Sequence, residues 1–259
     1  DDASDDDDVG AIVVTGAGRA FCAGMDLSTD GNVFGLNEEL RPTIQDIKDR
    51  PEDEDMVHGV RDSGGRVTLA IYDCKKPVIA AINGAAVGIG ATMTCAMDIR
   101  LASDKAKMGF VFNKIGITPE ACSSWFLPRI VGIQTALEWT FSGRVFEASE
   151  ALDRGFVRSV HAEDELLPAA KALAMEFSEM TSAVSVTLIR HMLWKMLGAD
   201  HPMEAHKIDS RGIRTLGKLP DCEEGVVSFT VEDEHALMAE PRQLRLRTVA
   251  THLGARDIS

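Results

Sequence analysis

The chain has 259 residues, enough to bury a substantial core, and its 45% hydrophobic and 26% charged content is ordinary for a globular protein. With 27 Lys and Arg against 41 Asp and Glu, the net charge is −14, so we expect no nucleic-acid partner, because phosphate neutralisation needs a basic surface. No apolar run approaches the roughly 18 residues that a membrane span requires, and no signal-peptide pattern opens the sequence, so we expect no membrane association. The five cysteines are odd in number and lack CxxC spacing, which indicates reduced thiols and a cytoplasmic location.

The first half of the chain alternates short apolar, β-branched runs with turn signals and small-residue segments. In chain order, this pattern predicts a strand at 11–14, a polar segment with a short helix at 26–54, a helix in the later part of 55–73, a strand at 78–82, a small-residue helix at about 88–97, and strands at 98–102 and 107–111. Such alternation indicates an α/β fold.

From about residue 121 the sequence favours helices. Ser149 is the expected cap of a short helix that ends near Arg154, before the stop signal of Gly155. The remaining expected elements are a strand at 156–160 and helices at 163–180, 182–197 and 202–217. Apolar residues form a stripe between 183 and 196, for which we expect buried packing or a subunit interface.

Two glycine-containing segments follow predicted strands. The first runs from Gly18 to Leu27 (GRAFCAGMDL), and its small residues allow the backbone to approach a ligand closely. The second runs from Ala80 to Thr92 (AAINGAAVGIGAT) and places glycines at a helix start, where unpaired N–H groups favour negative charge. Either segment taken singly is also explained by an ordinary glycine loop or by tight helix packing.

Together, the two segments resemble the oxyanion-hole motifs of the crotonase (enoyl-CoA hydratase/isomerase) superfamily, in the family's order. Two further stretches are similar to the family's active-site loop and to the region that follows it: Met108-Gly109 with 116–120 and 127–129, and 141–144 with Glu150-Ala151 and 155–157. The resemblance covers roughly residues 9–230. In pattern, the chain most closely resembles the peroxisomal-type Δ3,Δ2-enoyl-CoA isomerases.

The resemblance implies an α/β spiral of ββα turns over residues 1–180 and a helical oligomerisation region over 181–259, which would build homotrimers or hexamers made of two trimers. It implies that the backbone N–H groups of Met25 and Ile89 form the oxyanion hole. Acyl-CoA is then the substrate, with no permanently bound cofactor and no metal. The residues implied to contact it are Ala23, Met25, Asp26, Leu27 and Ile89.

The acid/base groups decide the reaction. Hydratases of the family usually carry two glutamates, and the matching positions here hold Thr92 and Phe112, neither of which is able to activate a water. Glu120 matches the single catalytic glutamate of the isomerases, so we expect double-bond isomerisation, with Phe110, Phe112, Trp125 and Phe126 as apolar lining that raises the carboxyl pKa. Glu120 could instead be a helix N-terminal acid favoured by the dipole.

Several alternatives stay open at this level. Hydration of 2-enoyl-CoA and a catalytically silent acyl-CoA-binding protein both fit the same motifs. The turn at 15–18 and the Tyr72-to-Lys76 spacing resemble short-chain dehydrogenases, but Ala20 and Cys22 stand where that family's next glycines belong. Cys22 and Cys95 lack a suitably spaced histidine for nucleophilic catalysis, and His201 with His206 offers at most a weak metal pair.

The sequence departs from the family at both ends. Family members usually have an earlier β-hairpin and helix, on the order of fifty residues, before the first motif, and this segment is not in the sequence. The stretch from about Thr230 to Ser259 also differs from the family's usual end.

Overall fold

The computed structural model describes residues 2–28, 31, 33–34, 37–179, 181–230 and 245–251, with side chains described through residue 227. The chain forms two compact units. The helical unit comprises Asp1–Val13, Asp73–Pro77 and Lys171–Arg247; the sheet unit comprises Val14–Tyr72, Val78–Ala170 and Thr248–Ser259. The expected boundary near residue 180 stays a prediction, as does the departure of the final stretch, most of which lies outside the described residues.

A five-stranded sheet has the order β8-β5-β3-β1-β9. Its strands are β1 (Val9–Gly16), β3 (Val78–Ile82), β5 (Ile99–Ser103), β8 (Ser159–His161) and β9 (Arg245–Thr251). β3 pairs in parallel with β5, and β5 with β8, with Ile79 opposite Ile99 and Leu101 opposite Ser159. All five residues of β3 are buried, as expected for an apolar strand covered on both faces.

A second sheet has the order β2-β4-β6-β7 and contains β2 (Ala20–Cys22), β4 (Ala85–Val87), β6 (Lys107–Gly109) and β7 (Val145–Glu147). The first three strands are parallel, with Cys22 opposite Ala86 and Val87 opposite Gly109, and β7 is antiparallel. Parallel strands end at the same edge, so the loops that follow β2 and β4 leave the sheet side by side.

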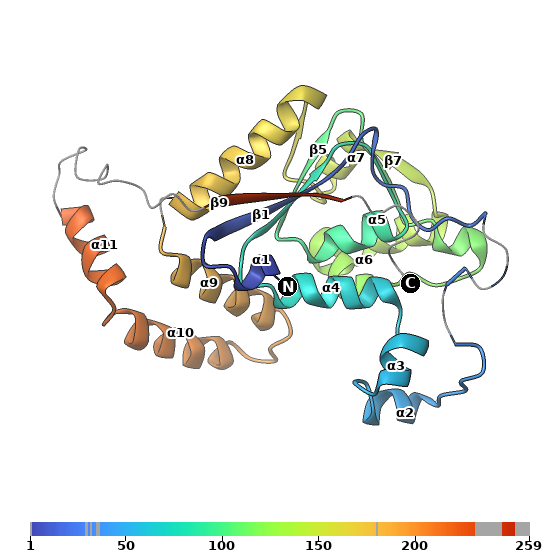
Figure 1. Cartoon of the computed structure of the whole chain (residues 1–259), viewed down its shortest axis with the longest axis horizontal. Coiled ribbons are helices and arrows are strands. Elements are labelled where there is room, and N and C mark those ends of the chain that lie inside the picture. The colour runs from blue at the N-terminus through green and yellow to red at the C-terminus, as the bar shows by residue number, and fades with distance from the viewer. Residues whose placement is uncertain are drawn as a thin grey trace. The chain divides into compact units, whose positions relative to one another are not determined.

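The helices of the sheet unit are α2 (Ile44–Asp49), α3 (Glu54–Gly59), α4 (Ser63–Asp73), α5 (Ile89–Thr92), α6 (Ser123–Ser142) and α7 (Ala148–Asp153), with 3₁₀ turns η1 (Met93–Ala96) and η2 (Phe112–Ile115). Figure 1 shows α4, α5 and α6 gathered together, with α2 and α3 forming a small group beyond the start of α4. Thr43 caps α2 in a capping box with Asp46. The predicted cap Ser149 is wrong, because α7 begins at Ala148 and its cap is Glu147.

An aromatic core stabilises the sheet unit. Trp139 stacks on Phe146 with ring centroids 4.0 Å apart, and Phe110 stacks on Trp139 at 6.0 Å and meets Phe156 edge-on at 5.9 Å. Phe110 therefore packs in this core, and its predicted contribution to the lining around Glu120 stays a prediction. Its ring stacks against α6 and β7 because it follows the antiparallel pairing of β6 with β7.

The helical unit contains α1 (Asp2–Asp5), α9 (Ala183–Met196), α10 (Pro202–Leu216), α11 (Pro220–Thr230) and the later part of α8 (Glu163–Glu179). The predicted helices at 163–180, 182–197 and 202–217 are thus confirmed within about a residue at each end. Arg190 of α9 is buried and donates from Nη1 to the carbonyl oxygen of Cys74 at 2.5 Å. The apolar stripe is only partly covered, since Ile189 and Leu193 remain 54% and 67% exposed.

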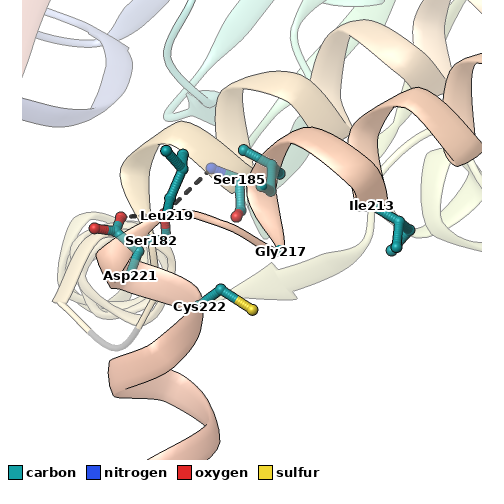
Figure 2. A pocket seen from close by; sticks show the side chains of 8 residues that line it. Ser182, Ser185, Ile213, Gly217, Leu219, Asp221 and Cys222 are labelled. Atoms are coloured by element: carbon teal, nitrogen blue, oxygen red, sulfur yellow. Dashed lines mark hydrogen bonds between the residues drawn. The ribbon is translucent and has the colours of Figure 1, made fainter.

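A cavity of about 300 Å³ lies in the helical unit. It is lined by Ser182, Ser185, Ile213, Leu216, Gly217, Leu219, Asp221 and Cys222. Figure 2 shows the Ser182 side chain bonded to Asp221, and the hydroxyl donates to the carboxylate at 2.7 Å. This cavity contains none of the predicted site residues.

Among the described residues, no single helix is long and apolar enough to cross a membrane, although α8 and α9, separated by a sharp bend, meet the length and hydropathy criteria as a pair.

Candidate active site

The two glycine-containing segments lie against each other in the sheet unit. A β-carbon built on Gly24 would lie 3.0 Å from the carbonyl oxygen of Val87, and one built on Gly90 would overlap the carbonyl oxygen of Cys22. Gly88 has a φ of 59°, and its β-carbon position is 4.0 Å from the Cα of Gly24. The parallel pairing of β2 with β4 therefore continues into a close approach of the two following loops, which only glycine permits.

Asn83 fastens the two segments at their bases. Its Oδ1 accepts the Gly16 N–H at 2.9 Å, and its Nδ2 donates to the carbonyl oxygen of Gly18 at 2.7 Å. The β-carbon position of Gly84 overlaps the carbonyl oxygen of Arg19. The Asn83-Gly84 turn thus holds the start of the first loop beside the end of β3.

The backbone N–H groups of Met25 and Ile89 come directly after Gly24 and Gly88, the two glycines that approach each other. Ile89 is the first residue of α5, and the N–H groups of Ala91 and Thr92 already bond to the Gly88 carbonyl. Neither the Met25 N–H nor the Ile89 N–H donates to an acceptor within the described part of the chain. Two unpaired donors on adjacent loops are what an oxyanion hole requires.

Four of the residues implied to contact CoA lie on the exposed continuation of the first loop, and the fifth, Ile89, is partly buried at the start of α5. Ala23 and Asp26 are exposed, and Met25 and Leu27 are 42% and 51% exposed. The Asp26 carboxylate accepts from the Ser28 N–H at 2.9 Å and from its hydroxyl at 2.6 Å. This segment therefore presents a backbone turn and apolar side chains to solvent, where a bound ligand could cover them.

Glu120 is half-buried between α5 and α4. The Thr92 hydroxyl donates to its Oε1 at 2.6 Å. On the other side, a β-carbon on Gly64 would overlap Oε2 and would lie 2.6 Å from Cδ1 of Ile89, so the Glu120 carboxyl group and the Ile89 side chain meet at one point of α4. Burial raises the pKa of Glu120 to about 7, against the lowering effect of Thr92 and with a further rise from Asp62. Glu120 therefore changes protonation near neutral pH.

The backbone that carries Glu120 is strained. Ala121 and Cys122 have φ values of 57° and 53°, in the left-handed region that favours glycine. The Asp62 carboxylate accepts the Ala121 N–H at 3.0 Å and also the Gly65 N–H. Ser123 donates its hydroxyl to the Glu120 carbonyl at 2.6 Å. These bonds hold a conformation that the sequence would not adopt locally.

The predicted aromatic lining of Glu120 stays a prediction. Trp125 and Phe126 form an aromatic cluster with Tyr72, with centroid distances of 4.7 Å between the first two and 6.0 Å from Tyr72 to Phe126. The groups that the structure brings to the carboxyl are Thr92, Ile89, Gly64 and Asp62. The roles of Gly64 and Asp62 were not predicted. The only feature of the sequence that could have indicated them is the Asp-Ser-Gly-Gly run at 62–65.

The other candidate residues do not assemble into sites. Cys22 and Cys95 are buried free thiols. His201 caps α10, its Nδ1 accepting the Met203 N–H at 3.1 Å, and His206 is exposed on the same helix. Within the described residues, no cluster of three or more His, Cys, Asp or Glu side chains could hold a metal.

Comparisons with known proteins agree with this geometry. The family model described as "Enoyl-CoA hydratase/isomerase" matches residues 1–236. An Alternaria alternata protein named Enoyl-CoA hydratase ACTT3 is 40% identical over 225 residues, which covers 86% of this chain and 69% of the relative.

Solved structures give the same result. A probable enoyl-CoA hydratase/isomerase from Mycobacterium abscessus superposes with a TM-score of 0.74 at 28% identity, covering 88% of this chain and 81% of that one. A monofunctional enoyl CoA isomerase from M. smegmatis superposes with a TM-score of 0.58 at 28% identity, covering 80% and 79%. The expected α/β spiral is confirmed by this likeness.

Proposed function

Because this chain belongs to the enoyl-CoA hydratase/isomerase family, we propose that it moves the double bond of an enoyl-CoA thioester from C3 to C2, with Glu120 as the single acid and base. The observation that carries the proposal is the environment of Glu120. A half-buried carboxyl with a pKa of about 7 takes up and releases a proton equally well near neutral pH, which suits a proton shuttle.

The proposed reaction has two proton transfers. The Glu120 carboxylate removes a proton from C2 of a 3-enoyl-CoA, and the C2–H bonding pair becomes a C1–C2 double bond. The C1–O π pair moves onto the thioester oxygen, which gives a dienolate that keeps the C3–C4 double bond and carries negative charge on that oxygen. The Met25 and Ile89 N–H groups donate to that oxygen, and the loss of one such donor typically raises the barrier by about 3 kcal/mol. The C3–C4 π pair then takes the proton from Glu120 at C4, and the C1–C2 pair becomes the new C2–C3 double bond. An oxygen lone pair restores the thioester carbonyl, and Glu120 is again a carboxylate.

In this proposal, Ile89 contributes to both the oxyanion hole and the surroundings of Glu120. Its N–H is one of the two proposed donors, and its side chain contacts the same point of α4 as the Glu120 carboxyl. We propose that the CoA portion lies along the exposed segment containing Ala23, Asp26 and Leu27, with no resident cofactor.

Hydration of a 2-enoyl-CoA is the second candidate, because the Alternaria relative is named an enoyl-CoA hydratase. Hydration needs a water held between two acid/base groups. Thr92 and Phe112 stand where hydratases usually carry glutamates, and Thr92 donates its hydroxyl to Glu120. This arrangement supports isomerisation over hydration.

Parallel incubations distinguish the two reactions. Purified protein is given 3-enoyl-CoA or trans-2-enoyl-CoA of the same chain length, and products are resolved by mass and ultraviolet absorbance. Isomerisation of the 3-enoyl substrate leaves the mass unchanged and creates the conjugated 2-enoyl chromophore. A product heavier by one water from the 2-enoyl substrate, with no conversion of the 3-enoyl substrate, would replace this proposal by hydration, and binding without any turnover would indicate a silent acyl-CoA-binding protein.

We further propose that the chain works in the cytoplasm as a homotrimer or a hexamer of two trimers. The exposed apolar residues of the C-terminal helices support this, including Leu193 at 67% and Ile213 at 78% exposure. Sedimentation or light scattering of the purified protein tests the assembly state.

A further inference from the structure

Asp62 stands immediately before α4, and its carboxylate contacts both the helix and the catalytic loop. It accepts the Gly65 N–H inside the first turn of α4. It also accepts the Ala121 N–H at 3.0 Å, across 59 positions of sequence. A single side chain thus ties the start of α4 to the residue that follows Glu120.

The Asp62 hydrogen bond to Ala121 acts on a strained part of the backbone. Ala121 and Cys122 are consecutive non-glycine residues with positive φ, and each such residue costs on the order of 1 kcal/mol or more. The Ala121 N–H that Asp62 accepts belongs to this strained pair. Without that bond, the left-handed conformation of Ala121 and Cys122 would lose a stabilising contact. The Glu120 carboxyl would then leave its position between Thr92 and Gly64.

The same carboxylate also acts on Glu120 directly. Its negative charge and a hydrogen bond donated by protonated Glu120 both raise the Glu120 pKa, in addition to burial. The other titratable groups near Glu120 are the thiols of Cys95 and Cys122, and burial raises the pKa of both, that of Cys95 to about 12. Arg61 acts electrostatically on Cys122 and uses its Nη1 for the Pro51 carbonyl and Glu52. Asp62 is therefore the charged partner that faces Glu120 among the described residues.

We propose that Asp62 is a positioning residue of the active site, which holds the Glu120 loop in its strained form through the Ala121 N–H and acts on the Glu120 carboxyl with its own charge. This inference rests on the proposed function of Glu120. It assigns two effects to one side chain, a geometric effect through Ala121 and an electrostatic effect on Glu120, and the two are separable by substitution.

Two variants separate the effects. Asp62→Asn keeps an oxygen that accepts the Ala121 N–H but removes the charge, whereas Asp62→Ala removes both. The control is Asp98→Asn, because the Asp98 carboxylate also accepts a backbone N–H, that of Val78 at 2.7 Å, at a place away from Glu120. For each protein, kcat and KM for 3-enoyl-CoA isomerisation are measured from pH 5 to pH 9.

The expected results differ by variant. In the unmodified protein, kcat/KM rises with pH through about 7, as Glu120 loses its proton. Asp62→Asn moves this acid limb to lower pH, because the charge that raised the Glu120 pKa is gone. Asp62→Ala moves the limb similarly and also lowers kcat by about 100-fold with little change in KM, as expected for a displaced catalytic group. Asp98→Asn leaves the limb in place.

An acid limb that stays in place or rises in Asp62→Asn would overturn the inference, even if Asp62→Ala does not fold. Glu120→Gln, assayed in parallel, separates the two levels of the argument. Full activity of Glu120→Gln overturns the proposed function itself. An inactive Glu120→Gln together with an unmoved limb in Asp62→Asn overturns only the role of Asp62.

Discussion

Two glutamates of the sheet unit, Glu120 and Glu150, lie in opposite electrostatic environments. Glu150 accepts two hydrogen bonds from the Arg144 guanidinium, one of them 2.6 Å long, and one from the Trp139 indole at 2.9 Å. The Arg144 bond holds the Glu150 pKa below its usual range. Glu120 has a hydroxyl donor and a second carboxylate instead, and burial raises its pKa to about 7.

The difference separates a structural acid from a reactive one. Glu150 therefore keeps its charge near neutral pH, and its bonds to Arg144 and Trp139 fix the stretch between α6 and α7. Glu120 lies in surroundings that disfavour its charge, so its proton is free to move. The predictions below test that contrast, in order of the expected effect on turnover.

Glu120→Gln should have the largest effect. It removes the only proposed proton carrier, so kcat for 3-enoyl-CoA isomerisation should fall by about 10²–10⁴-fold. Continuous absorbance assays at pH 8 measure it. Glu147→Gln, which alters an exposed ion pair with Lys107, is the matched control and should remain fully active.

The same substitution should also stabilise the protein in alkaline solution. Below pH 4.5, Glu120 is neutral in the folded and unfolded states. Between 4.5 and about 7, the unfolded state releases the proton while the folded state keeps it, so stability falls as pH rises through this window. Glutamine has no such loss, so the Tm advantage of Glu120→Gln should be greater at pH 8 than at pH 4.5. Equal Tm differences at both values would contradict the raised pKa.

Gly64→Ala should reduce turnover by about 100-fold, because the added methyl group overlaps the Glu120 carboxyl and misplaces it. Gly212→Ala provides the control. A β-carbon at Gly212, which also lies in a helix, meets no atom within 4 Å, so the change should leave kcat unaltered. Comparable losses in both variants would show that the collision with Glu120 is not the cause.

Thr92→Val should have a smaller effect, several-fold at neutral pH. The Thr92 hydroxyl bond lowers the Glu120 pKa, so its removal should move the acid limb of kcat/KM above pH 7. At pH 9 the variant should recover most of its activity. A limb that moves to lower pH would mean that Thr92 does not donate to the carboxylate.

Glu150→Ala should leave turnover per folded molecule unchanged, the smallest catalytic effect of the series. It leaves the Nε1–H of the fully buried Trp139 without its acceptor, which should lower the free energy of unfolding by about 1–3 kcal/mol. Urea titration measures the loss. An altered pH profile in this variant would remove the distinction between the two glutamates.

The sequence was sufficient for elements whose signals are local. β3 was predicted at its observed bounds because Pro77 and Asn83-Gly84 enclose one continuous apolar run. Glu120 and the two glycine loops were found because motifs carry them, and the structure brings those loops together.

Long-range contacts were beyond the sequence. Asp62 meets Ala121 only because α4 packs beside the catalytic loop, 59 positions away. The stacking of Phe110 on Trp139 was also not predicted, because the two rings are far apart in the sequence.

The left-handed backbone at Ala121 and Cys122 has a practical consequence for protein engineering. Glycine at either position would relieve conformational strain of on the order of 1 kcal/mol, so a screen for heat resistance would select it. The same exchange would make the loop more mobile and lower the turnover rate. Libraries built from this chain should therefore be screened for thermostability and activity together. A variant with glycine at either of these two positions is expected to be more thermostable but less active.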